Sequence, residues 1–279
     1  MSRVFLRTLA AAMLTGMVCS AGVNAEVPAA EFLAAGLCKQ ETSLTNALEV
    51  DYTCEWKSSE NGVPTDRLVR QFKYVRTPEV LRIERFDPGG RTVTCSYDRV
   101  DPQFRSLNTK GSESLGWSGT KLGSLFGNRE LLETSRYPLF EGPLCERIEF
   151  GTVREQMEEV DGHDCWCIDV PTEYTTLEKY VVWVDPDVGF NPRRIKYVWK
   201  HEQPTVITFK DYAQHGTGFW FPNQQHLEYF WTSKNLAYTQ VNTVTRISTA
   251  RSIPKDELIV EFPSGTVLRT PGGGKVTVP

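Results

Sequence analysis

The sequence lacks several features that would place it in a familiar functional class. It has no basic excess, since 31 lysines and arginines stand against 35 acidic residues and the formal net charge is −4. A nucleic-acid-binding protein usually carries such an excess, so we expect no nucleic-acid partner. The mean hydropathy of −0.36 excludes a protein built from several membrane-spanning helices. Histidine is also scarce, with four in 279 residues.

The common catalytic motifs are missing as well. Residues 116–120 read Gly-Trp-Ser-Gly-Thr, and the second glycine comes one position too early for a nucleophile elbow. Residues 274–275 lack the upstream glycine and the following hydroxyl residue of a phosphate-binding loop. Residues 185–189 include two aspartates, but their glycine is not at the position that a calcium-binding loop requires. We therefore predict no catalytic residue, metal or cofactor. A hydrolase remains an alternative, because catalytic groups converge only in space.

The first 25 residues have the pattern of a secretory signal peptide. Arg3 and Arg7 form a short basic region, and residues 9–18 form an apolar run. Residues 23–25, Val-Asn-Ala, supply small residues at the positions that a signal peptidase reads. A membrane anchor is the alternative, but the apolar run is too short to span a bilayer. The pattern predicts cleavage after Ala25 and a periplasmic or otherwise exported protein.

Cysteine usage agrees with an exported chain. Of seven cysteines, Cys19 would leave with the signal peptide. An even number in an exported protein favours disulfides. Two neighbours on one strand face lie roughly 7 Å apart, so Cys165 and Cys167 cannot bond to each other. The other pairings stay open among six candidates, which are Cys38, Cys54, Cys95, Cys145, Cys165 and Cys167.

A metal site is the alternative interpretation of the same segment. His163, Cys165, Cys167 and Asp169 alternate, so a strand would place all four on one face. The ligands of one zinc ion must converge, however, and a flat strand spreads them apart. Because no second cluster of histidine and cysteine follows, the pattern favours disulfides over zinc, and free thiols are the remaining alternative.

Hydrophobic periodicity predicts one helix followed by many strands. Leucines at three- and four-residue spacings indicate a helix within residues 26–49. Glycines and serines among apolar residues at 115–137 indicate short, weak helices that could form a mobile lid. Alternation elsewhere predicts strands near 50–57, 68–74, 80–86, 93–97, 148–160, 163–170, 177–185, 193–202, 205–213, 219–232 and 236–248.

These elements predict a mainly β protein of the α+β class. Strands do not alternate with helices, so we expect an antiparallel sheet. Residues 177–185 are apolar on both faces, and such a strand must be covered on both faces. We predict a strongly curved sheet or half-open β-barrel of about 10–12 strands, with an N-terminal helix and a helical lid. Residues 26–265 would form one domain, and residues 266–279 a flexible tail.

Three segments resemble the LolA/LolB-like superfamily of bacterial periplasmic lipoprotein carriers. Residues 180–195 read Tyr-Val-Val-Trp-Val-Asp-Pro-Asp-Val-Gly-Phe-Asn-Pro-Arg-Arg-Ile, which is similar to a strand–turn–strand segment of that superfamily. Tyr212 followed by residues 220–222, Trp-Phe-Pro, resembles its later hairpin. Residues 259–266 resemble the ends of exported members. The resemblance implies a half-open barrel with a helical lid, whose hollow holds acyl chains.

A physical argument for a lipid pocket stands beside this resemblance. An acyl chain gains roughly 0.8 kcal/mol for each methylene that it buries in an apolar cavity. Arg70 and Arg82 are candidates for contacts with a head group, although exposed strand arginines are the commoner arrangement. The candidate lining residues of the cavity and lid are Phe86, Trp117, Leu122, Leu125, Phe126, Trp183, Tyr197, Trp199, Tyr229 and Trp231.

We therefore predict an exported, non-enzymatic protein that binds or carries a lipid, a lipoprotein acyl chain or another apolar ligand. Its partners would be that ligand and a membrane-bound acceptor. The alternative is a periplasmic sensor or protein-interaction module on the same fold, with these aromatic residues in a closed core. The sequence leaves the ligand and the oligomeric state open.

Overall fold

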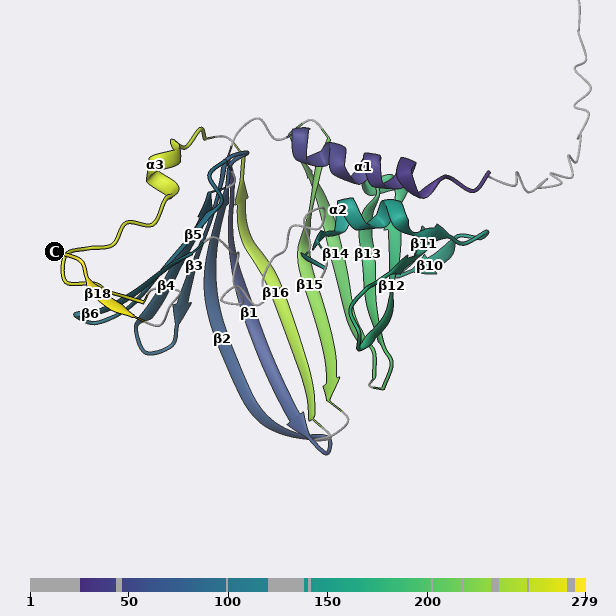
Figure 1. The fold of residues 1–279 in the computed structure, drawn as a ribbon. Helices are drawn as coiled ribbons and strands as arrows, with labels where there is room; N and C mark the ends of the chain where they lie inside the picture. The colour runs from purple at the N-terminus through teal and green to yellow at the C-terminus, as the bar shows by residue number, and fades with distance from the viewer. Residues whose placement is uncertain are drawn as a thin grey trace, which may run out of the picture.

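The computed structural model describes residues 26–43, 47–98, 100–119, 138–139, 142–201, 203–216, 218–231, 236–249, 251–269 and 274–279. One strongly curved sheet makes up most of the molecule, and it stays open rather than closing into a barrel (Figure 1). A single long helix, α1 (Ala30–Ser43), lies across one half of the sheet.

The remaining elements are mostly strands joined by short turns. In the first half of the chain they are β1 (Leu48–Glu60), β2 (Val63–Arg76), β3 (Val80–Asp87), β4 (Arg91–Asp98), β5 (Gln103–Lys110) and β6 (Glu113–Gly119). Then follow β7 (Pro138–Leu139), β8 (Gly142–Pro143), α2 (Leu144–Arg147), η1 (Ile148–Phe150), β9 (Thr152–Val153), β10 (Glu158–Val160), β11 (His163–Pro171), β12 (Leu177–Asp185) and η2 (Pro186–Val188). The chain ends with β13 (Asn191–Trp199), β14 (Thr205–His215), β15 (Phe219–Trp231), β16 (Leu236–Ser248), α3 (Lys255–Leu258), β17 (Val267–Arg269) and β18 (Lys275–Thr277).

The main sheet has 16 strands in the order β10-β11-β12-β13-β14-β15-β16-β1-β2-β3-β4-β5-β6-β17-β18, with β9 paired to β11. The pairs along this order are antiparallel except β6–β17, which is parallel. The central pairing joins β1 to β16, so strands from the early and late parts of the sequence meet in the middle of the sheet, whereas the C-terminal β18 lies at its edge. This confirms the strongly curved antiparallel sheet. The strand number exceeds the expected one because short pairs such as β17–β18 carry little periodicity.

The tight turns that the sequence indicates are formed as hairpins. Asn61 and Gly62 have φ angles of 51° and 78°, and Asp161 and Gly162 have φ angles of 52° and 83°. Two-residue turns with both φ angles positive match the twist of the flanking strands. These turns therefore hold β1–β2 and β10–β11 in register.

Two apolar clusters share one face of the sheet, which we call the inner face. The register shows this directly, because Cys54 pairs with Asn242, Asn242 with Gln225, and Gln225 with Phe209. Cross-strand partners point to the same side. Cys54 belongs to the cluster of β1–β6, and Phe209 belongs to the cluster beneath α1.

Helix α1 covers the inner face over the second half of the sheet. Leu33, Ala34 and Leu37 are buried against Leu144 and Ile148 and against residues of β11–β15. The cluster on β1–β6 is different, since every one of its members is a strand residue. The helical cover that we expected is therefore present over β11–β15.

The opposite, outer face is covered in two places. Cys165, Cys167, Val181 and Trp183 form a small cluster on β11 and β12. Since other residues of β11 and β12 enter the inner cluster, these strands are covered on both faces, as predicted. At the other end of the sheet, Leu258 of α3 packs against Val75 and Val80 in a second small apolar cluster.

Several predicted boundaries differ from the structure. The helix expected within residues 26–49 is the shorter α1, because β1 already begins at Leu48. Residues 144–150 form α2 and η1 rather than the start of a strand at 148–160, since Leu144 and Ile148 face α1. Leu115–Gly119 form the end of β6 instead of a helical lid, because they pair with β5 and β17.

The predicted tail also departs from expectation. We expected residues 266–279 to be flexible, but β17 and β18 add two short strands to the edge of β6. The open edge of β6 offers backbone hydrogen-bond partners, which composition does not reveal. The predicted signal peptide, residues 1–25, and residues 120–137 of the predicted lid lie outside the described residues.

Candidate functional site: the inner face of the sheet

Aromatic side chains line the inner face of β1–β6. Tyr52 and Phe72 stack with ring centroids 4.9 Å apart and planes 5° apart. Phe104 and Trp117 contact each other at 5.2 Å. Tyr52, Phe72 and Phe104 are at most 2% exposed. The long strands alternate in sequence, so each contributes every second residue to this surface.

Four of the predicted lining residues lie on the inner face. Trp117 belongs to the cluster of β1–β6, whereas Tyr197, Trp199 and Tyr229 belong to the cluster that α1 covers. Tyr197 contacts Trp199 with centroids 6.2 Å apart. These three residues therefore lie where helix α1 packs on the inner face, whereas Trp117 belongs to the cluster whose described members are all strand residues.

Two predicted lining residues point the other way. Trp183 lies in the outer cluster with Cys167, and its Nε1 donates a 2.8 Å hydrogen bond to Oε2 of Glu158. Phe86 is 40% exposed, and it pairs with Gln71 on the face opposite Phe72. Both therefore lie away from the inner face, and the sequence did not show this because large apolar side chains on a strand do not reveal which face is concave. Leu122, Leu125 and Phe126 lie outside the described residues, as does the side chain of Trp231.

Sequence reasoning missed most of the aromatic lining on β1–β6. The alternation of 50–56 and 68–74 indicated a buried face, which was assigned to the core rather than to a site. Strand β5 was not predicted at all, so Phe104 went unnoticed. The missed aromatics of this cluster are Tyr52, Trp56, Phe72, Tyr74, Tyr97 and Phe104 on β1–β5, together with Phe219 and Phe221 on β15.

A row of buried amides separates the two apolar clusters. Asn242 donates a 2.6 Å hydrogen bond to Oε1 of Gln225, and Gln240 donates a 3.1 Å hydrogen bond to Oδ1 of Asn242. All three side chains are at most 1% exposed. Amides buried this deeply must be satisfied by hydrogen bonds. The row therefore gives the middle of the inner face a fixed polar stripe.

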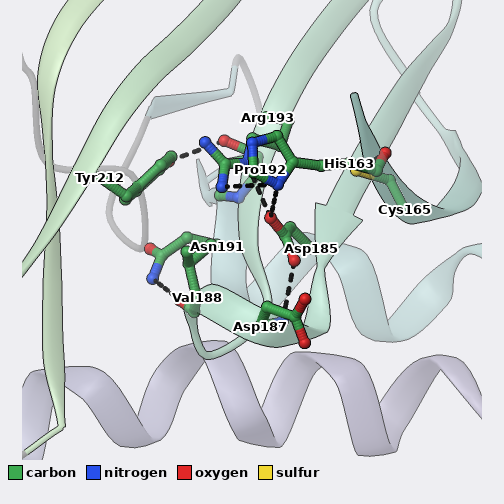
Figure 2. A network of polar contacts seen from close by, with 9 residues as sticks. All are labelled: His163, Cys165, Asp185, Asp187, Val188, Asn191, Pro192, Arg193 and Tyr212. Carbon is green, nitrogen blue, oxygen red and sulfur yellow. Dashed lines mark hydrogen bonds and ion pairs between the residues drawn. The ribbon is translucent and has the colours of Figure 1, made fainter. Parts of the chain in front are cut away.

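A polar network holds the turn between β12 and β13, where the sequence has its Asp-Pro-Asp-Val-Gly motif (Figure 2). Asp185 is 1% exposed, and one of its oxygens accepts a 2.8 Å hydrogen bond from the backbone of Asp187. Its other oxygen accepts a 2.8 Å hydrogen bond from Nε of Arg193. Gly189 closes η2 with a φ angle of 69°. A buried ion pair needs such additional hydrogen bonds to offset its desolvation.

Aromatic and imidazole groups complete this network. The Arg193 guanidinium lies 4.9 Å from the ring centre of Tyr212, and the Tyr212 hydroxyl donates a 2.7 Å hydrogen bond to Pro192. His163 Nδ1 lies 3.6 Å from Asp185. Asp185 and Arg193 are thus each engaged by their neighbours and fix the turn, while the His163 side chain is 44% exposed.

The network does not form a cysteine–histidine catalytic pair. The thiol of Cys165 donates to the backbone carbonyl of His163 at 3.5 Å rather than to its ring. Burial raises the pKa of Cys165 to about 12, and burial likewise raises that of Cys167 to about 12. A thiolate is the reactive form, so both thiols are held in their inert state.

Cys165 and Cys167 also depart from the disulfide prediction. Both carry free thiols in the structure, and they are the only cysteines of their outer cluster. Of the other candidates, Cys38 and Cys145 lie at the cluster beneath α1, and Cys54 and Cys95 lie in the cluster of β1–β6. Disulfides among those four stay a prediction.

Two features are absent from the part of the chain that the structure describes. Within it, no group of three or more histidine, cysteine, aspartate or glutamate side chains is placed to hold a metal ion. Within the same ranges, no helix has the length and apolar character needed to cross a membrane.

Comparison with known proteins rests on structure alone, since no family model and no curated protein matches the chain. The fold is similar to a DUF1329 family protein from Desulfovibrio piger, with 13% identity, a TM-score of 0.53, and coverage of 82% of this chain and 99% of that chain. It is also similar to a domain from Vibrio parahaemolyticus named for outer membrane lipoprotein sorting, with 10% identity, a TM-score of 0.51, and coverage of 82% and 97%.

A LolA superfamily protein from Nitrosomonas europaea also matches, with 11% identity, a TM-score of 0.48, and coverage of 81% of this chain and 97% of that chain. At such identities the likeness concerns the fold. The chain therefore has the curved, open antiparallel sheet of the DUF1329 and lipoprotein-sorting structures, in agreement with the fold that its sequence resemblance implied.

Proposed function

We propose that this protein is exported to the periplasm and binds a lipid or a lipoprotein acyl chain without covalent catalysis. The ligand's tail lies on the inner face of β1–β6, and the protein passes it to a membrane-bound acceptor. The lipoprotein-sorting name of a structure with the same fold supports this function.

The observation that carries the proposal is the difference between the two halves of the inner face. A sheet with an apolar face needs a second layer against that face. Over β11–β15 that layer is α1 with α2 and η1, whereas among the described residues the cluster of β1–β6 consists of strand residues alone. Tyr52 and Phe72 are buried members of an aromatic cluster there and Trp117 is a partly buried one, and burying an acyl chain beside this cluster is favourable.

Two measurements test this function on the purified full chain. Extraction with organic solvent and mass spectrometry would detect co-purified lipid. Titration with N-phenyl-1-naphthylamine, an uncharged dye that fluoresces in apolar surroundings, would detect a free apolar site. We expect saturable dye binding that oleoylglycerol displaces. A protein that carries no lipid and binds no dye would contradict the proposal and favour a protein-interaction module.

A matched pair of variants locates the site. Trp56 is partly buried on the inner face, and Val69 is 42% exposed on the outer face of the neighbouring strand. Trp56→Glu places a charge where the tail would lie, so we expect at least about tenfold weaker dye binding. Val69→Glu should leave binding unchanged. Val244→Asn, also on the inner face, serves if Trp56→Glu does not fold. Equal effects of inner and outer substitutions would overturn the location.

A further inference from the structure

The inner face of β2–β6 changes from apolar to basic along its strands. Phe72 pairs with Arg85, and Arg85 pairs with Val93, so the arginine shares the face of the aromatic cluster. One cross-strand row further along, Asp87 pairs with Arg91, and Arg91 pairs with Lys110. Basic side chains therefore continue the apolar surface directly toward one end of these strands.

The C-terminal strands add two more basic residues to this region. Trp117 of β6 stands beside Arg269 of β17, and Arg269 pairs with Lys275 of β18. The residues meet around a pocket of about 180 Å³, whose polar lining is Arg85, Arg91, Arg269, Asn108 and Ser106 and whose aromatic wall is Trp117. An adjoining groove of about 630 Å³ shares Arg91 and Asn108 with this pocket.

The charges of this region are unbalanced. The pocket and groove together are lined by five basic residues, and Glu113 is the one acidic residue among their lining. This excess lies in a chain whose formal net charge is −4. Like charges gathered at one site repel one another, so their proximity favours an anion that neutralises them.

The arginines also keep donors available for an anion. Arg85 is held by Asp87, with one hydrogen bond of 3.3 Å from Nη2, and Asp87 is shared with Arg70 at 2.8 Å. Arg91 donates to the neutral Asn108 at 3.0 Å and has no carboxylate partner among the described residues. The side chain of Arg269 makes no hydrogen bond or ion pair within the described ranges. A guanidinium presents five N–H donors that match a carboxylate or phosphate.

We propose that this arginine-lined pocket binds the anionic head group, a phosphate or carboxylate, of an amphiphile whose tail lies on the apolar inner face. The inference rests on the proposed function and specifies its ligand class. A pocket of about 180 Å³ is small for an acyl chain but holds an anionic group with its first waters. Trp117, which contacts Phe104 at 5.2 Å, marks the boundary between the basic pocket and the apolar cluster.

The test compares two lipids with the same tail. Oleoyl lysophosphatidate carries a phosphate that oleoylglycerol lacks, and inorganic phosphate carries no tail. Binding of each to the full chain is measured by calorimetry, below the concentration at which the lipids aggregate. We expect lysophosphatidate to bind at least about tenfold more tightly than oleoylglycerol, because charge-assisted hydrogen bonds are added. Inorganic phosphate should bind far more weakly than either lipid.

Variants assign the difference to the pocket. Arg91 and Arg269 are both exposed, so Arg91→Gln with Arg269→Gln should leave the fold intact. We expect this double variant to bind lysophosphatidate no more tightly than oleoylglycerol, with oleoylglycerol binding unchanged. The matched control is Arg67→Gln with Arg246→Gln, which removes two arginines that pair with Glu55 and Asp51 on the outer face.

The outcomes separate this inference from the proposed function. Equal affinity of the wild-type protein for both lipids, or equal losses in the pocket and control variants, would overturn the anionic site and leave the apolar site standing. Inorganic phosphate binding as tightly as lysophosphatidate would overturn the amphiphile, since the tail would contribute nothing. Failure of both lipids and of the uncharged dye to bind would refute the proposed function itself.

Discussion

At the scale of single residues, Asp98 shows how one carboxylate ties a distant segment to the sheet. Its Oδ1 accepts hydrogen bonds from the backbones of Val100 and Asp101 at 3.0 and 3.2 Å. Its Oδ2 lies 2.7 Å from Nζ of Lys255, the first residue of α3. Burial acts to raise the pKa of Asp98, but the hydrogen bonds from Lys255 and the turn outweigh it and lower that pKa.

This geometry predicts an acid-dependent contribution to stability. A lowered pKa means that the contribution is present above the ordinary value of 3.8 and is lost as the pH falls through the folded-state pKa. We expect Asp98→Asn to lower the free energy of unfolding by about 1 kcal/mol at pH 7, and the difference from wild type to shrink below pH 3.8. Urea unfolding at several pH values measures it. The exposed Asp101→Asn is the control, and a difference independent of pH would contradict the assignment.

At the scale of elements, α1 approaches the β12–β13 turn so closely that a glycine is required. A Cβ atom at Gly36 would lie 2.2 Å from the ring of Phe190. Phe190 also contacts Phe32 of α1, with ring centroids 5.5 Å apart. The buried pair of Asp185 and Arg193 fixes the turn that carries Phe190. The helix therefore packs against a rigid turn, and neither side moves easily.

We expect Gly36→Ala to destabilise the protein, although alanine is the better helix former. The propensity gain is about 1 kcal/mol, whereas overpacking a rigid contact costs about 1–3 kcal/mol. Phe190→Ala removes the obstructing ring, so in its background Gly36→Ala should become neutral or stabilising. A double-mutant cycle from thermal or urea unfolding measures the coupling. Additive effects of the two substitutions would show that the contact is absent.

At the scale of the whole molecule, the sheet stays open, and its β6 end is reinforced by the C-terminal segment. The segment around α3 is held on the outer face by backbone contacts, as Val260 donates to Ser96 at 2.9 Å and Arg105 donates to the Val260 carbonyl at 3.3 Å. This segment leads to β17 and β18, which protect the edge of β6. This pairing removes the open edge of β6, a longer strand that would otherwise be free to pair with other sheets.

The predicted export gives a measurement on the intact protein. When the full chain is expressed with its first 25 residues in a Gram-negative host, we expect a mature protein that begins at Glu26. Intact mass spectrometry measures this, and Ala25→Arg, which removes the small residue at the cleavage site, should leave the precursor uncut.

Alkylation without reductant should label Cys165 and Cys167 only after denaturation. An uncut wild-type chain, or a disulfide at either cysteine, would contradict the corresponding prediction.

The sequence by itself determined the class and the local plan of this protein. Strand periodicity follows from the alternation of side chains, so most long strands, the Asn-Gly and Asp-Gly turns and the antiparallel arrangement were predictable from the order and pattern of residues. Helix α1 was predictable from its leucines at three- and four-residue spacings, but its exact ends were not.

Only the tertiary structure decided which face of each strand is concave and which residues meet there. Trp183 and Trp199 are equally apolar, yet one faces outward and the other inward. Arg85, Arg91 and Arg269 come from β3, β4 and β17, and nothing in their spacing indicates a shared pocket. Cross-strand register and sheet curvature bring them together, and these depend on pairings between segments far apart in the chain.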